Sequence, residues 1–382
     1  MEGLDAATHQ SGTGWRKEMI SPREDPVPDF GMNGRISAID GWRAISVTLV
    51  IVSHVLARIP LAGRSAIAIL VSHDYGALGV RIFFVISGFV ICRSFIQERK
   101  KNKIISIAAF CIRRVFRIQP PLLLYLLVIC SLALMGFVDR NALGASKGLF
   151  FICDIDGVDC GGYLGNHQWS LAVEEQFYLV FPLLFLTRGK QPNFFLAAMA
   201  AIPTLSVALA MLGFANAASF IATFVFISAG VFLAFNESRI TNLAAKLPPG
   251  LIAAAAIAVL IISIMPPGRS ATILIDFVLP LLIGFVLLAT TLVRSSWQRV
   301  LAARPMVAFG RISYGVYLWQ QLATYPFRGA GYLFYLCSLC ACVIFCFASF
   351  YYFERPLIGY GHKLSRRLQG SEALKGQRVS QI

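Results

Sequence analysis

Long apolar runs separated by short polar segments fill most of the chain between residues 37 and 353. Each run is close to the roughly 20 residues that an α-helix needs to cross a bilayer. The pattern therefore predicts an all-α, polytopic membrane protein with about ten transmembrane helices. The predicted spans are 37–58, 77–96, 119–138, 169–187, 193–213, 215–235, 249–266, 271–293, 309–328 and 331–353.

The polar segments complete the predicted organisation. Residues 1–34 combine acidic, basic and proline residues without an apolar core, which is typical of a disordered cytoplasmic tail. A membrane domain is expected over 35–357, followed by a basic cytoplasmic tail over 358–382. Residues 101–120, between the second and third spans, are too basic to cross the membrane. They predict an amphipathic helix on the cytoplasmic surface.

Composition agrees with the membrane class and gives an orientation. The chain is 57% hydrophobic and 14% charged, whereas a soluble domain is nearer a quarter charged. The net charge of +15 does not indicate a nucleic-acid partner, because the basic residues gather in alternate loops of a membrane protein. Most of the 34 Lys and Arg residues fall on one side of the predicted membrane. The positive-inside rule then predicts a multi-pass protein of the cytoplasmic membrane with both termini cytoplasmic.

The first span carries two ionisable residues that predict a functional pathway. Arg43 and His54 are eleven residues apart, almost three helical turns, so their side chains emerge on one face. The rise between them is about 16 Å, which puts Arg43 near the cytoplasmic surface and His54 near the outer one. An imidazole there could accept a proton from a hydroxyl or carry an acyl group transiently. The alternative is a structural histidine that hydrogen-bonds a neighbouring helix.

The fourth span enters the membrane from the outer side and brings a second polar group. Glu174 lies about one turn inside, at the depth expected for His54. We therefore expect the Glu174 carboxylate to orient the His54 imidazole. Glu175 points about 100° away on the same helix, so the two carboxylates cannot face one partner. Trp169, at the outer end, is also typical of an interfacial anchor.

Arg113, Arg114 and Arg117 form a basic cluster on the cytoplasmic side. Because the guanidinium fork binds phosphates well, this cluster and Arg43 could hold a polyphosphorylated metabolite such as acyl-coenzyme A. The extended pantetheine arm could then reach across the membrane toward His54. The alternative is that the cluster binds anionic membrane lipids and sets the topology.

Other residues are interpreted as structural. Glu354 and Arg355 end the last span, and an ion pair between Glu354 and an arginine of the cluster is expected. Most of the nine cysteines lie in apolar segments and indicate packing, so no metal site is expected. Cys153 and Cys160 flank a polar loop, where a disulfide and free thiols are equal alternatives. Gly79 and Gly88, in the second span, would let neighbouring helices approach closely.

Six motifs follow one another in order between about residues 35 and 365. They are RISAIDGWRAISVTLVIVSH, GVRIFFVISGFVI, FCIRRVFRIQP, HQWSLAVEEQFYLVFPLL, GRISYGVYLW and FERP. As an ordered set they resemble acyltransferase family 3, the integral-membrane O-acyltransferases of polysaccharides, Nod factors and related carbohydrates. The resemblance implies transfer of an acyl group, usually acetyl, from cytoplasmic acyl-coenzyme A. The implied acceptor is a hydroxyl of an extracytoplasmic carbohydrate or lipid-linked glycan.

The family motifs imply roles for particular residues. The Arg-x10-His motif falls on Arg43 and His54, and implies that His54 takes part in catalysis. The Trp-Ser…Glu motif falls on Trp169, Ser170 and Glu174, which implies a place for the first two in substrate binding. The basic motif falls on the arginine cluster, as expected for residues that bind acetyl-CoA.

The chain departs from the usual family pattern at three positions. Trp42 stands where leucine is frequent, Arg81 where an acidic residue is common, and Gln320 where many relatives have histidine. The rival interpretation is a transporter or flippase of a lipid-linked sugar, which could use the same buried polar residues without acyl transfer. That interpretation predicts no acetylated product and no binding of coenzyme A by the arginine cluster.

Overall fold

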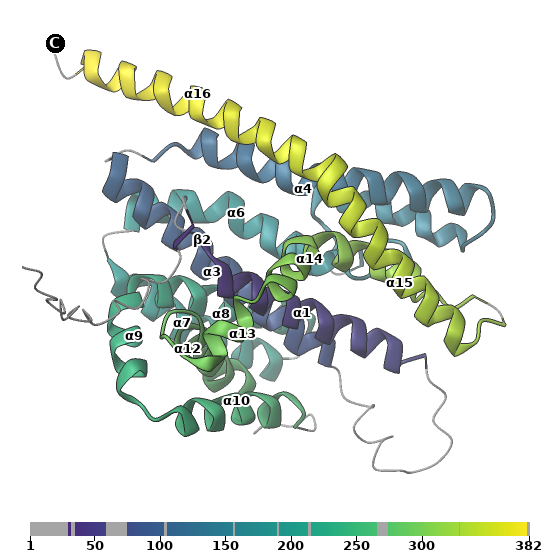
Figure 1. Cartoon of the computed structure of the whole chain (residues 1–382), viewed down its shortest axis with the longest axis horizontal. Helices are drawn as coiled ribbons and strands as arrows, with labels where there is room; N and C mark the ends of the chain where they lie inside the picture. The colour runs from purple at the N-terminus through teal and green to yellow at the C-terminus, as the bar shows by residue number, and fades with distance from the viewer. Residues whose placement is uncertain are drawn as a thin grey trace, which may run out of the picture.

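The computed structural model describes residues 30–31, 35–58, 75–102, 105–155, 157–188, 191–212, 215–265, 274–327 and 329–379. This part of the chain is mostly helical (Figure 1). Two short strands, β1 (Phe30–Gly31) and β2 (Arg35–Ile36), pair antiparallel just before the first long helix. Apart from β1, the predicted tail over 1–34 lies outside the described residues.

Every predicted span overlaps a helix. The longer helices are α1 (Ser37–Leu56), α3 (Tyr75–Asn102), α4 (Ile107–Leu134), α6 (Gln168–Arg188), α7 (Pro192–Met211), α8 (Ala215–Phe235), α10 (Pro249–Ser263), α12 (Leu279–Thr291), α14 (Arg304–Ala323), α15 (Tyr332–Ser349) and α16 (Arg355–Val379). Short helical segments link them: η1 (Arg140–Phe150), α5 (Gly162–Gly165), α9 (Glu237–Lys246), η2 (Leu274–Val278), α13 (Ser296–Leu301) and η3 (Phe350–Glu354).

The helices confirm an all-α, multi-pass membrane protein, but they do not confirm the predicted count of about ten spans. Among the described residues, six helices are long and apolar enough to cross a bilayer. A seventh is reached if α8 and α9, which are bent by 83° at their junction, form one broken span. Two of the predicted spans, α7 and α10, are shorter apolar helices. By length and composition, the described helices therefore account for six or seven full crossings.

The predicted amphipathic surface helix is not a separate element. Residues 107–120 of this predicted element form the first turns of α4, which continues through Pro120 and Pro121 to Leu134. The basic residues of 101–120 had indicated an element separate from the apolar run that follows, yet the helix is not interrupted at the two prolines, where a break is common. In the fold, α16 packs along α4, with Gly361 lying against the ring of Phe116. This lateral packing supports one continuous helix.

The centre of the molecule is formed by α1 and α3, with α16 lying along α4 at one edge (Figure 1). α3 packs between α1 and α8 and is the most buried of the candidate spans. A Cβ atom on Gly88 would overlap the carbonyl oxygen of Ile227 in α8, and one on Gly230 would overlap that of Val85 in α3. The close helix approach expected at Gly88 is therefore confirmed.

The substitution Gly88→Ala should lower the unfolding temperature of the detergent-solubilised protein. The added methyl group meets backbone, which cannot rotate away, and such overpacking costs about 1–3 kcal/mol. Gly359→Ala is the matched control, because Gly359 is also helical and a Cβ there meets nothing within 4 Å. Equal melting curves for the two variants would contradict the packing described for α3 and α8.

Candidate active site

A cavity of about 580 Å³ lies at the C-terminal end of α1 and is called here the His54 cavity. Its walls come from α1, α3, α7, α8, η2, α14, the start of α6 and the two residues before Gln168. The polar residues of its lining are Ser53, His54, Arg81, Asn166, His167, Ser206, Thr223, Asp276, Tyr317 and Gln321. A space of this size is typical of a site for a small molecule or for the end of a larger one.

The contacts of His54 define its tautomer. Nδ1 lies 2.9 Å from the carbonyl oxygen of Val50, one turn earlier in α1. A carbonyl can only accept, so the neutral ring carries its hydrogen on Nδ1 and leaves a lone pair on Nε2. The amide nitrogen of Gln321 donates to this Nε2 across 3.2 Å. The imidazole is therefore held with its basic nitrogen turned toward α14.

A second, smaller cavity of about 80 Å³ adjoins the first and is called the arginine cavity. Its charged lining residues are Arg43, Arg114, Arg117, Glu174 and Glu175. Val80, Phe84 and Tyr317 line both cavities and form a shared wall between them. The two cavities thus lie on either side of this wall, one lined by Arg43 and the other by His54, both from α1.

The three arginines of the smaller cavity are held by different partners. Arg43 makes an ion pair with the buried Asp40, one turn away, at 3.4 Å. The guanidinium of Arg114 lies 4.8 Å from the ring centroid of Tyr178. Arg117 interacts electrostatically with Glu354, which is buried and accepts a 3.0 Å hydrogen bond from Ser349.

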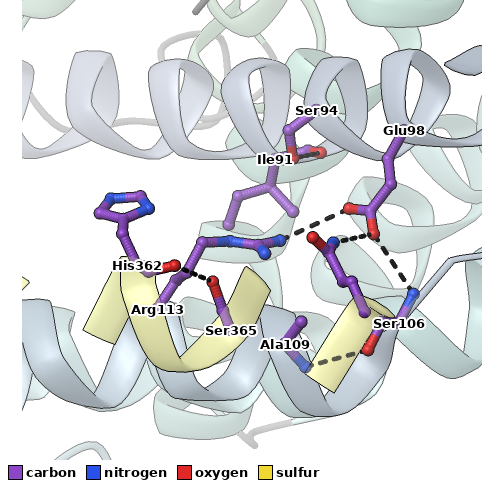
Figure 2. A network of polar contacts seen from close by, with 9 residues as sticks. Ile91, Ser94, Glu98, Ser106, Ala109, Arg113, His362 and Ser365 are labelled. Atoms are coloured by element: carbon purple, nitrogen blue, oxygen red, sulfur yellow. Dashed lines mark hydrogen bonds and ion pairs between the residues drawn. The ribbon is translucent and has the colours of Figure 1, made fainter. Parts of the chain in front are cut away.

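Arg113 lies outside this cavity, although it is adjacent in sequence to Arg114. It forms a 3.4 Å ion pair with Glu98 of α3, as Figure 2 shows. Glu98 also accepts from the backbone of Ser106 at 3.3 Å and from the amide of Gln369 at 2.8 Å. The network joins α3, α4 and α16, so the contacts of Arg113 are those of a structural residue.

The polar residues of α6 are divided between the two cavities. Trp169 lines the His54 cavity, while Ser170 and Glu174 line the arginine cavity. Glu174 accepts hydrogen bonds from Ser87 and Tyr178. Glu174 is five positions after Trp169 on α6, a rise of about 7.5 Å. The structure therefore does not bring Glu174 into the cavity of His54, where the depth argument had put it.

The remaining predicted residues lie near these cavities. The hydroxyl of Ser170 lies 2.6 Å from that of Tyr317, and both reach the backbone carbonyl of His167 at 3.1 Å. Arg355 is exposed, with its guanidinium 5.9 Å from the ring centroid of Tyr351. Cys153 and Cys160, for which the sequence left two alternatives, form a disulfide.

Sequence reasoning missed several residues of the His54 cavity. His167, in the segment just before α6, is one of them: it is 4% exposed and lies in the cavity lining. Arg81 interacts electrostatically with Asp276 across the cavity. Asp276 had a usable signal, because an acidic residue inside an apolar span is costly unless it serves a function. Gln321 had none, since amides are common in helices. Among the described residues, no cluster of His, Cys, Asp or Glu is arranged to bind a metal.

Apolar helices that enclose two adjoining polar cavities define a multi-pass membrane protein with a buried site. A family model described as "Acyltransferase domain" matches residues 36–354, most of the chain. The protein therefore belongs to acyltransferase family 3.

Relatives in Staphylococcus aureus carry related names. The O-acetyltransferase OatA of strain NCTC 8325 / PS 47 is 29% identical over 206 residues, which are 50% of this chain and 30% of that protein. A candidate O-acetyltransferase of strain COL is 32% identical over 163 residues, 40% of this chain and 25% of its own length. The chain thus matches less than a third of the length of these relatives. No solved structure matches.

Proposed function

We propose that the protein is a membrane O-acetyltransferase that moves an acetyl group from cytoplasmic acetyl-CoA to a hydroxyl of an extracytoplasmic carbohydrate. The acceptor class is a surface polysaccharide, a lipid-linked glycan or a lipo-oligosaccharide. The observation that carries the proposal is the shared wall between a cavity lined by guanidinium groups and one lined by an imidazole. Family membership and the names of the relatives support acyl transfer and, within it, acetyl transfer.

Donor binding is assigned to Arg43, Arg114 and Arg117, whose guanidinium groups suit phosphate oxygens. Because the guanidinium groups suit phosphates, the nucleotide is expected at the cytoplasmic mouth of the arginine cavity, with the pantetheine arm leading inward. The acyl group then reaches His54 when the wall that includes Tyr317 opens. Glu174 is assigned to this donor side, where its carboxylate balances the guanidinium charges.

His54 is assigned the role of general base. Its Nε2 takes the proton of the acceptor hydroxyl as the hydroxyl oxygen attacks the thioester carbonyl. The carbon–oxygen bond forms, the carbon–sulfur bond breaks, and the departing coenzyme A thiolate takes the proton from the imidazolium. The tautomer described above supports this role because the Nδ1 hydrogen is already engaged by Val50. Trp169, in the wall of the same cavity, would contact the acceptor.

The orientation rests on two independent arguments. The positive-inside rule puts the arginine end of α1 and both termini in the cytoplasm. The disulfide between Cys153 and Cys160 belongs to the segment before α6, on the His54 side, and disulfides persist in oxidising compartments. Both arguments support an extracytoplasmic position for the His54 cavity.

Labelling from outside the cell tests this orientation. After mild reduction with a membrane-impermeant phosphine, the Cys153 and Cys160 thiols of intact cells should react with an impermeant maleimide and shift the protein on a gel. The double variant Cys153→Ser, Cys160→Ser should lose this shift and serves as the control. Labelling that appears only after the membrane is opened would reverse the assigned orientation.

The proposed activity is tested with purified protein and radiolabelled acetyl-CoA. Acetyl-CoA should raise the melting temperature, because a ligand that binds only the folded state stabilises it by mass action. Mass spectrometry of surface glycans, with and without the gene, should reveal an acetyl ester that depends on the protein. A transporter or flippase of a lipid-linked sugar would show neither the stabilisation nor the ester.

A further inference from the structure

The structure assigns Gln321 as the positioning residue for the His54 imidazole, through an amide that presents either of its two ends to Nε2. This inference rests on the proposed function, in which His54 acts as a base. The sequence had suggested a carboxylate for the position beside His54. The structure puts an uncharged amide there, at 3.2 Å, from a helix 267 residues further along the chain.

The resting contact has a fixed direction. The Nδ1 hydrogen of His54 is donated to Val50, so Nε2 is an acceptor and must face the amide nitrogen of Gln321. The amide oxygen of Gln321 is then left buried and without a hydrogen-bond partner among the described residues. The side chain as a whole is only 3% exposed. One end of the amide therefore caps the base, while the other end is an unused acceptor.

Protonation of His54 reverses what this contact requires. Once Nε2 carries a proton it becomes a donor, and a facing amide nitrogen would be repelled. A half-turn of the amide brings the unused oxygen of Gln321 to the imidazolium and forms a charge-assisted hydrogen bond, stronger than the one it replaces. Before the turn the amide oxygen of Gln321 lacks a partner, and after it the amide nitrogen does. The number of buried unpaired groups therefore stays the same.

An amide suits this position better than a carboxylate. A carboxylate beside His54 would favour the imidazolium before the acceptor arrives and would remove the base. Gln321 carries no charge, so it leaves the resting ring neutral and still accepts its proton during turnover. The acceptor hydroxyl displaces the amide nitrogen from Nε2 and gives up its proton. The amide oxygen then holds the proton until the coenzyme A thiolate takes it.

Several other charged or titratable groups lie near the His54 ring. Arg58 stacks on Tyr163, whose ring meets the edge of His54. His167 interacts electrostatically with His54. Arg81 and Asp276 belong to the same cavity wall. None of these groups is altered by a substitution at position 321.

The test compares Gln321→Glu, Gln321→Met and the control Gln320→Met. Gln320 is the neighbouring buried amide of α14, but it does not line the His54 cavity. For Gln321→Glu, the acid limb of the kcat profile should move to higher pH by about one unit or more, because the carboxylate holds the proton. For Gln321→Met, kcat should fall about 10- to 100-fold with little change in the KM for acetyl-CoA. Gln320→Met should leave both the profile and kcat unchanged.

A second readout does not depend on acetyl transfer. Diethyl pyrocarbonate modifies neutral imidazole, and peptide mass spectrometry measures its reaction at His54 as a function of pH. The midpoint should rise in Gln321→Glu, and the rate above the midpoint should increase in Gln321→Met, which no longer caps Nε2. Superimposed curves for all variants would overturn the assignment of Gln321. A different outcome would overturn the proposed function alone. In that outcome the unaltered protein transfers no acetyl group, while the midpoint of the diethyl pyrocarbonate reaction still rises in Gln321→Glu.

Discussion

Replacing His54 by alanine is expected to lower acetyl transfer about 10²- to 10⁴-fold, the range found when general base catalysis is lost. The change removes the imidazole that Val50 and Gln321 hold in place by hydrogen bonds. The measurement is the rate of radiolabel transfer from acetyl-CoA to acceptor, with the variant expressed and purified in the same way as the unaltered protein.

A control separates chemistry from binding in this experiment. His54→Ala should be stabilised by acetyl-CoA as much as the unaltered protein, because the arginines that bind the donor lie in the other cavity. Full turnover by the variant would rule out His54 as the base. Loss of both turnover and stabilisation would point to a folding defect, and His54→Gln, which keeps the side chain polar and similar in length, would then take its place.

The second large effect is expected at the donor site. Arg114→Gln should raise the KM for acetyl-CoA about 10- to 100-fold, since a hydrogen bond to a charged group contributes roughly 1.5–3 kcal/mol. The guanidinium of Arg114 lies over the rings of Phe110 and Tyr178, and it also interacts electrostatically with Glu175 in the same cavity. The measurement is the initial rate as a function of acetyl-CoA concentration, repeated at two salt concentrations. Salt screens charge interactions, so it should raise the KM for acetyl-CoA more in the unaltered protein than in Arg114→Gln.

Arg113→Gln is the matched control for this prediction. The two arginines are neighbours in sequence, yet one lines the arginine cavity and the other pairs with Glu98. Loss of the pair should lower the melting temperature of Arg113→Gln and leave its KM for acetyl-CoA unchanged. Equal increases in KM for the two variants would show that the basic cluster acts as one surface, as the sequence alone suggested.

Much of the architecture is readable from the sequence because it depends on local periodicity. Apolar runs located every predicted span on a helix, and the eleven-residue spacing put Arg43 and His54 on one face of α1. The ordered motifs indicated the family, which the match over residues 36–354 confirms. The number of full crossings was less secure, since apolar content does not distinguish a short packed helix such as α10 from a complete span.

The partners of the buried charges were decided only by the tertiary structure. Nothing local separates Arg113 from Arg114, but α16 packs on α4 and Glu98 of α3 pairs with Arg113, which takes the first arginine into a structural network. Likewise, depth along α6 could not show that Glu174 faces Ser87 and Tyr178.

The sequence by itself therefore determined that this is an all-α membrane protein of the acyltransferase family 3 type with an arginine and a histidine on its first span. The tertiary structure decided which groups meet them. The physical reason is that a hydrogen bond such as that between Gln321 and His54 joins residues 267 positions apart. Helical periodicity fixes the direction of a side chain on its own helix, whereas its partner depends on how distant helices pack.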